Sequence, residues 1–117
     1  MIEVGEYVRL DDGTVGKYKI NKNYFDVVET NIAEIGFDIE KDVIKHSKNI
    51  IDLIEVGDYV NGERIFATDN RINDNGEKVV LAENYSEWTD DGVLANKDIK
   101  SIVTKKQFAN IEYRLEE

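Results

Sequence analysis

The stretch Ile2-Glu3-Val4-Gly5-Glu6-Tyr7-Val8 recurs as Ile54-Glu55-Val56-Gly57-Asp58-Tyr59-Val60, and the two copies differ only by one methylene group in one carboxylate side chain. A second similarity relates the ends of the two halves, because Ser47-Lys48 and Ile54-Glu55 are matched by Thr104-Lys105 and Ile111-Glu112. Each half is therefore expected to end with the same kind of turn leading into the same kind of strand. The repeat predicts two copies of one small structural unit.

Strand signals dominate the rest of the chain. Short runs of β-branched and aromatic residues are separated by Gly, Asn and Asp. Asp12-Gly13, Asn61-Gly62 and Asn75-Gly76 predict tight hairpin turns, since glycine supplies the positive φ that such turns require. Ser47 and Thr104 are good N-cap residues, and each predicts a helical turn or two after it. The strands are expected over residues 4–10, 15–20, 24–28, 37–44, 59–60, 64–67, 78–82, 93–94 and 99–103.

These patterns predict an all-β protein, mainly β with one or two short helical turns, made of two tandem, similar, barrel-like units. The first unit is expected over residues 1–57 and the second over 54–117, with the strand around 53–61 shared between them. Two such small units are marginal alone, so the chain is expected to behave as one cooperative domain. The predicted buried residues are Val4, Val8, Val15, Val27, Ile54, Val56, Val60, Val79, Leu81, Ile102, Phe108 and Ile111.

The composition excludes several kinds of site. The chain has no cysteine and one histidine, so disulfides, thiolate metal sites and a histidine cluster for zinc are ruled out. The oxygen-rich run from Asp69 to Glu77 does not fit a calcium loop. If Gly76 were the glycine at the sixth position of such a loop, the first ligand position would be Arg71, a cation that cannot bind calcium. His46 has no nucleophile motif near it. We therefore expect no cofactor, no metal and no enzymatic activity.

Charge restricts the possible partners. The chain has 15 basic and 25 acidic residues, a formal net charge of −10. A chain of this charge is repelled by phosphate unless its cations are segregated on one face, so direct nucleic-acid binding is not expected. The sequence shows neither a signal segment nor an apolar run long enough to span a bilayer. It predicts a cytoplasmic protein without a membrane segment.

Trp88 is the residue that most invites a functional interpretation. A lone tryptophan in a polar loop is either the lid of a small core or an exposed anchor for a partner, because its ring combines a large apolar area with one polar group. The densest carboxylate run of the chain surrounds it. The candidate partner-binding residues are Trp88, Glu83, Glu87, Asp90 and Asp91.

Two groups of cations occupy corresponding places in the two halves, just before and within the capped turns. They either balance an acidic chain and protect strand edges from pairing, or form a small basic stripe along both units. The residues concerned are Lys41, Lys45, His46 and Lys48 in the first half and Lys97, Lys100, Lys105 and Lys106 in the second.

The spacing of hairpins, with a short helical turn before the final strand, resembles small barrels of the Src-homology-3-like kind, including KOW-type modules. This is a likeness of fold that carries no function with it. The segments Lys48–Gly62 and Ile99–Phe108, the latter continuing through Ile111-Glu112-Tyr113, resemble uncharacterised small proteins of phages, prophages and conjugative elements of low-GC Gram-positive bacteria. The similarity covers residues 43–62 and 98–115. It implies a mobile-element origin, and it identifies no functional residues in this chain.

Taken together, these features favour a non-enzymatic interaction module of a phage or mobile element. Its partner would be a basic protein, for example a host nucleic-acid-handling defence protein that the chain inhibits, as an anti-CRISPR-like protein or a nucleic-acid mimic does. One alternative is a KOW-like module associated with nucleic acid or the ribosome, which would use the lysine groups. Another is an accessory protein of phage structure or assembly. The sequence leaves the oligomeric state open.

Overall fold

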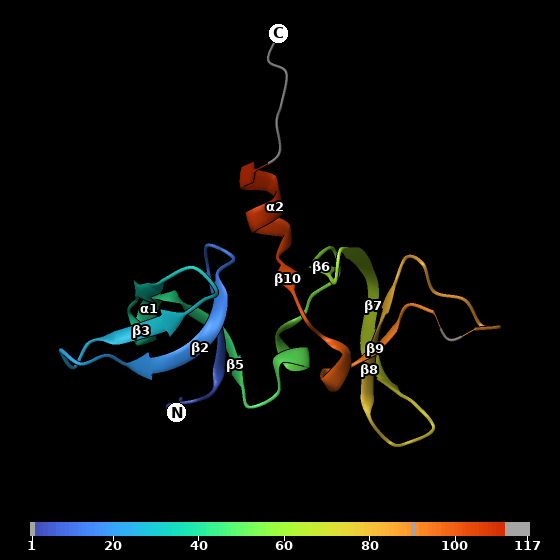
Figure 1. Cartoon of the computed structure of the whole chain (residues 1–117), viewed down its shortest axis with the longest axis horizontal. Coiled ribbons are helices and arrows are strands. Elements are labelled where there is room, and N and C mark those ends of the chain that lie inside the picture. The colour runs from blue at the N-terminus through green and yellow to red at the C-terminus, as the bar shows by residue number, and fades with distance from the viewer. Residues whose placement is uncertain (1, 90, 112–117) are drawn as a thin grey trace, which may run out of the picture.

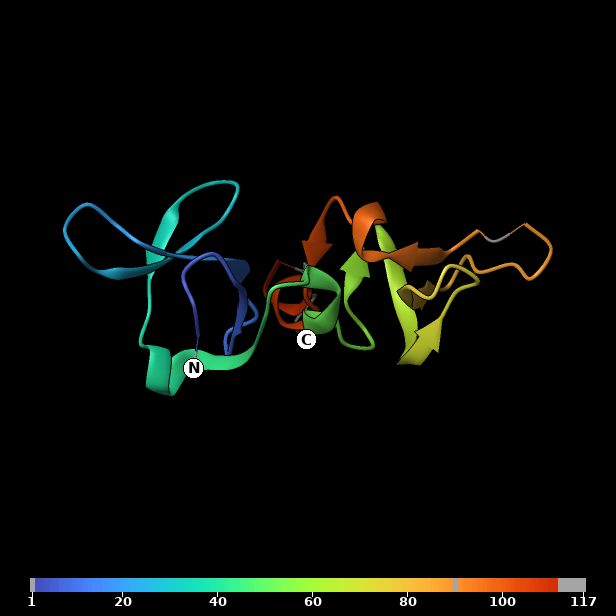
Figure 2. The same ribbon diagram turned by 90° about the horizontal axis from the view of Figure 1, so that it is seen from below.

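The protein is mainly β, as the sequence predicts. In the computed structural model, which describes residues 2–89 and 91–111, the chain forms ten strands in two five-stranded sheets, with two short α-helices and two 3-10 helices. All strand pairs are antiparallel. The two sheets lie side by side, and the helices η1 (Ile50–Leu53) and α2 (Lys105–Ile111) lie between them (Figures 1 and 2).

The first sheet has the strand order β4-β3-β2-β1-β5. Its strands are β1 (Tyr7–Leu10), β2 (Val15–Ile20), β3 (Asp26–Glu29), β4 (Glu34–Gly36) and β5 (Val43–Ser47). The helix α1 (Ile39–Asp42) joins β4 to β5. It begins there because the Asp38 side chain accepts hydrogen bonds from the Glu40 and Lys41 amides.

The second sheet has the strand order β10-β6-β7-β8-β9. Its strands are β6 (Tyr59–Val60), β7 (Glu63–Ile72), β8 (Lys78–Ala82), β9 (Val93–Ala95) and β10 (Ile102–Val103). The helix η1 (Ile50–Leu53) precedes β6, η2 (Asn96–Asp98) precedes β10, and α2 (Lys105–Ile111) follows β10. Both helical turns expected after Ser47 and Thr104 are therefore present.

The two sheets have the same connectivity, with β1 to β5 in the places of β6 to β10. The repeated stretch also folds alike in both copies, since Gly5 and Gly57 have φ values of 97° and 98°. The first copy has the hydrogen bonds Glu3 N to Glu6 Oε2 (2.5 Å) and Gly5 N to Tyr18 O (2.9 Å). The second has Glu55 N to Asp58 Oδ2 (2.8 Å) and Gly57 N to Ile65 O (2.9 Å). Closure of either sheet into a barrel, and extension of the repeat over whole halves, stay predictions.

The strand expected around 53–61 and shared by both units is not formed. Only Tyr59–Val60 is a strand, and it pairs with β7 and β10 of the second sheet. The positive φ of Gly57 and the bond from the Glu55 amide to Asp58 turn the chain just before it. The first sheet therefore ends with β5, while the proposed unit limits, 1–57 and 54–117, stay predictions.

The same turn explains two wrong predictions of burial. Val4 and Val56 precede the turn glycine in each copy and are 60% and 46% exposed. Their apolar character had suggested that the strand begins earlier, at Val4, whereas β1 begins at Tyr7. Phe108 is also exposed, and it stacks on Tyr59 with ring centroids 4.5 Å apart. The strand predicted over residues 37–44 is wrong as well, because the Asp38 cap starts α1 within it.

Each sheet has its own apolar cluster. The first consists of Val8, Leu10, Tyr18 and Val28, and the second of Ile51, Ile54, Val60, Ile65, Val80 and Ala82. Six predicted residues are buried, namely Val8, Val27, Ile54, Val60, Val79 and Leu81. Val15 and Ile102 are half-buried, and the side chain of Ile111 lies outside the described part of the chain.

Buried polar contacts join the two halves. They lie where β1 meets η1, the turn at Gly57 and the start of α2. Arg9 of β1 is 2% exposed and donates to both carboxylate oxygens of Asp58, at 2.5 and 3.0 Å, and to the Leu53 carbonyl at 3.0 Å. Asp58 also accepts from the Lys105 amide at 3.0 Å, so it holds the start of α2. Thr104 Oγ1 donates to the Gly13 carbonyl of the β1–β2 turn at 2.8 Å. These contacts place α2 between the two sheets.

Candidate functional site

The loop from Glu83 to Gly92 joins β8 to β9 and extends from the outer end of the second sheet (Figure 1). Its ends are closed by hydrogen bonds from Ala82 N to Gly92 O (2.9 Å) and from Ser86 N to Asp91 O (3.0 Å). Gly92 has a φ of 77°, and a Cβ there would lie 2.6 Å from the Tyr85 amide nitrogen. The loop therefore has a defined base that requires glycine at this position. We call residues 83–92 the Trp88 loop.

Trp88 lies at the surface of this loop. Its side chain is 92% exposed, which excludes the lid of a core and leaves the anchor interpretation. Its amide donates to Ser86 Oγ at 3.3 Å, so the backbone next to the ring is held by the loop itself. At the loop base the Tyr85 ring lies 6.4 Å from the exposed Phe66 of β7, between centroids. Exposed aromatic surface thus continues from the loop onto the sheet.

The Trp88 loop also carries exposed carboxylates. Glu83, Glu87 and Asp91 are exposed, whereas Asp90 lies outside the described residues. Glu83 accepts from the Arg64 guanidinium at 2.8 Å, and this hydrogen bond raises the pKa of Arg64. The ion pair fixes the start of the loop to β7. Glu87 and Asp91 lie one and three positions from Trp88 and give the loop its acidic character.

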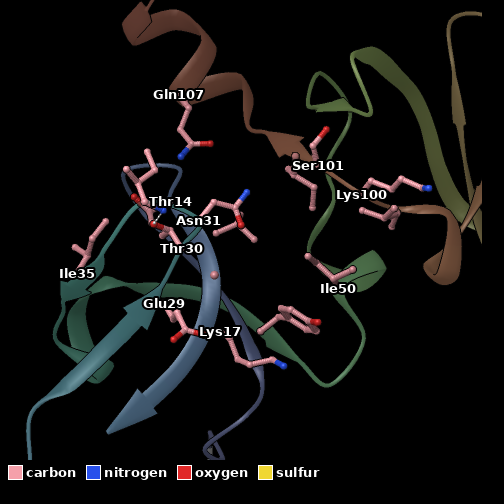
Figure 3. Close-up of a pocket in the computed structure, with 16 residues that line it drawn as sticks. Thr14, Lys17, Glu29, Thr30, Asn31, Ile35, Ile50, Lys100, Ser101 and Gln107 are labelled. Atoms are coloured by element: carbon pink, nitrogen blue, oxygen red, sulfur yellow. Dashed lines mark hydrogen bonds between the residues drawn. The ribbon is translucent and has the colours of Figure 1, made fainter. Parts of the chain in front are cut away.

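A groove of about 420 Å³ lies where the two halves meet (Figure 3). Its walls come from β2 and the β3–β4 connection on one side and from η1 and the η2–β10 segment on the other. The sequence did not indicate it, because its residues come from separate segments spread between Tyr7 and Gln107 and form no motif. Its lining residues include Tyr7, Lys17, Glu29, Ile32, Lys100 and Ile102. We call this cavity the junction groove.

The first half also exposes apolar side chains that the sequence analysis missed. Tyr24 is 90% exposed and has a φ of 65°, and Ile32 is 94% exposed. Tyr24 had been assigned to a strand, but β3 begins at Asp26 and Tyr24 belongs to the preceding turn. The Asn21 side chain, which accepts from the Asn23 and Phe25 amides, is the sequence signal for that turn.

The two cation groups do not form a basic stripe that is open along its length. Six of their eight members are engaged by acidic side chains or by a carbonyl. The ion pairs are Lys45–Glu55, Lys48–Glu3, Lys97–Glu77 and Lys105–Glu55, and His46 Nδ1 lies 3.0 Å from Glu6 Oε1. Lys106 donates to the Asp11 carbonyl. This arrangement disfavours phosphate binding by these residues.

Three further results concern metal sites, membrane segments and similarity to known proteins. Among residues 2–89 and 91–111, no group of three or more His, Cys, Asp or Glu side chains is arranged to hold a metal ion. No helix in the same part of the chain combines the length and the apolar character needed to cross a membrane. No protein-family model, curated protein or solved structure matches the chain.

Proposed function

We propose that the protein is a non-enzymatic interaction module that binds a basic surface of a partner protein through the Trp88 loop. The observation that carries this proposal is the 92% exposure of Trp88 on a loop with a defined base and exposed carboxylates. An indole that is exposed in the free protein can be buried on binding, and such aromatic anchors commonly contribute about 2 kcal/mol or more to a complex.

The charge of the loop indicates the chemistry of the partner. Glu87 and Asp91 are exposed on the same loop as the indole, and the whole chain carries a net charge of −10. Complementary charge accelerates association and excludes acidic partners, while the aromatic anchor supplies most of the affinity. A basic protein with an apolar recess fits both features.

The sequence resemblance to small phage and mobile-element proteins narrows this proposal further. In that context the basic partner is a nucleic-acid-handling defence protein of the bacterial host, which the chain inhibits by occupying a surface that otherwise binds nucleic acid. Such a protein acts in the host cytoplasm.

Affinity capture tests the proposal. The full chain, its Trp88→Ala variant and its Tyr24→Ala variant serve as baits for a bacterial lysate. Tyr24 is the matched control, because it is an equally exposed aromatic residue in the other half. The proposal predicts a basic protein retained by the wild type and by Tyr24→Ala, lost with Trp88→Ala, and eluted by moderate salt. Retention of that protein by Trp88→Ala would refute the role of the loop.

A further inference from the structure

The junction groove has the size and composition of a binding site that is separate from the Trp88 loop. Its volume of about 420 Å³ lies in the range of roughly 300–1,000 Å³ typical of ligand pockets. Apolar side chains from both halves line it, including Tyr7, Ile32, Ile50 and Ile102. Uncharged polar side chains also line it, among them Thr14, Asn31, Ser101 and Gln107 (Figure 3).

The charge of the groove differs from that of the rest of the chain. Its 16 lining residues include two lysines, Lys17 and Lys100, and a single carboxylate, Glu29. Glu29 is paired with Lys19 at 2.6 Å, so its charge is compensated from outside the groove. The Lys17 ammonium lies 5.3 Å from the centroid of the Tyr7 ring, a cation–π contact that places it beside the apolar wall. On a chain of net charge −10, the groove is a carboxylate-poor surface with two cations.

The backbone of β10 offers a further recognition element. The Asn61 amide donates to the Ser101 carbonyl at 3.0 Å, and Ile102 pairs with Val60. Because hydrogen-bonded and non-bonded pairs alternate in an antiparallel ladder, the N–H and C=O of Ile102 point away from β6. β10 is an edge strand of its sheet and Ile102 lines the groove. An extended chain lying beside it can therefore form main-chain hydrogen bonds.

We propose that the junction groove binds an extended peptide segment of a partner protein, with a carboxylate that pairs with Lys17 and an apolar side chain between the two halves. A peptide fits better than nucleic acid, because one carboxylate needs one cation whereas a run of phosphates would meet the net charge of −10. The groove and the Trp88 loop have opposite charge preferences, so they take different ligands.

Selection from a displayed library of short random peptides tests this proposal, with the full-length protein as the target. The affinities of enriched peptides are then measured for the wild type and for variants in matched pairs. Lys17→Glu is compared with Lys22→Glu, which makes the same charge change at an exposed turn outside the groove. Ile32→Ser is compared with Ile72→Ser, since both side chains are exposed and only Ile32 lines the groove. All four changes are at exposed positions, so the fold is retained.

The expected result is enrichment of peptides that combine Asp or Glu with an apolar residue. Lys17→Glu should lower the affinity for these peptides about tenfold or more, and Ile32→Ser about threefold. Both control variants and Trp88→Ala should bind the peptides as the wild type does. Three results would overturn the proposal. These are no enrichment, enriched peptides that bind equally to Lys17→Glu, and a fluorescent oligonucleotide that binds in place of peptides and depends on Lys17.

Discussion

Arg9 of β1 and Asp58 of the second repeated turn form a buried two-pronged ion pair, with distances of 2.5 and 3.0 Å. Asp58 stands at the one position where the two copies of the repeat differ. In the first copy this position is Glu6, whose carboxylate binds its own turn amide and lies 3.0 Å from His46 Nδ1. In the second copy the carboxylate binds its turn amide, Arg9 and the first amide of α2. The residue that distinguishes the copies therefore connects the halves.

Asp58→Asn should destabilise the fold by about 3–5 kcal/mol, because it leaves the buried Arg9 charge with only the more distant carboxylate of Glu55, at 3.6 Å. Urea denaturation measures this loss. The matched control is Glu29→Gln, which breaks the exposed Lys19–Glu29 pair and should cost about 1 kcal/mol or less. Equal losses for the two variants would show that Arg9–Asp58 does not hold the halves together.

Acid should destabilise the protein through Glu55. Burial raises the pKa of Glu55, but the hydrogen bond from Lys105 and the charges of Arg9 and Lys45 outweigh it and hold the pKa below its ordinary 4.5. A depressed pKa contributes stability above the unfolded value that is lost as pH falls through the folded one. The free energy of unfolding should therefore decrease below about pH 4.5.

Urea denaturation across this pH range checks the prediction, and Glu55→Gln should flatten the decrease. Glu63→Gln, at an exposed position of β7, is the control with the same chemical change. A profile that Glu55→Gln leaves unchanged would exclude Glu55 as a source of the acid sensitivity.

Gly57→Val should destabilise the fold by about 1 kcal/mol or more, because valine is strained at a φ of 98°. Space is not the obstacle, since the nearest atom to a Cβ there is 3.4 Å away. Gly36→Val is the control, in β4, where a Cβ would meet nothing within 4 Å. The thermal midpoint should decrease only for Gly57→Val, and an unchanged midpoint would contradict the role of the turn.

Local chemistry explains what the sequence predicted well. The limits of β2 and β8 were predicted correctly, because their β-branched residues are bounded by turn signals such as Asn75-Gly76. The limit of β1 was wrong because hydrophobicity alone places Val4 in a strand, whereas the Gly5 turn turns it outward. Asp38 is a capping residue within the strand predicted over residues 37–44, and its side chain starts the helix α1 there.

The candidate sites also differed in how far the sequence could predict them. Trp88 was recognisable because tryptophan within a polar run is rare, but its exposure depends on loop hydrogen bonds that no sequence spacing shows. The junction groove was not predictable, since it arises only when residues such as Tyr7 and Ile102 meet across the two halves. Arg9 and Asp58 looked like two of many surface charges until their burial was known.

Trp88→Ala should leave the free energy of unfolding within about 0.5 kcal/mol of the wild type, because the side chain is 92% exposed. Ile65→Ala, at a fully buried position, is the contrasting variant and should cost about 2–5 kcal/mol. Chemical denaturation measures both. A loss of several kcal/mol for Trp88→Ala would mean that the ring packs on the core.

The protein should not retard nucleic acid in a gel shift at low salt, with either single-stranded or duplex probes. Most cations of the two lysine groups are engaged by neighbouring acidic side chains, and the net charge repels phosphate. A shift that weakens steeply with salt, and that Lys100→Glu abolishes, would instead favour a nucleic-acid-binding module.

Fluorescence quenching of Trp88 tests the central claim most directly, because this residue is the sole tryptophan of the chain. An exposed indole among carboxylates should show the red-shifted emission of a hydrated ring. The ratio of caesium to iodide quenching should be higher than for a free, uncharged tryptophan analogue, because the acidic loop attracts the cation and repels the anion, and the excess should shrink as added salt screens the charges. Blue-shifted emission, or a caesium-to-iodide quenching ratio no higher than that of the free analogue, would contradict an exposed aromatic anchor on an acidic loop.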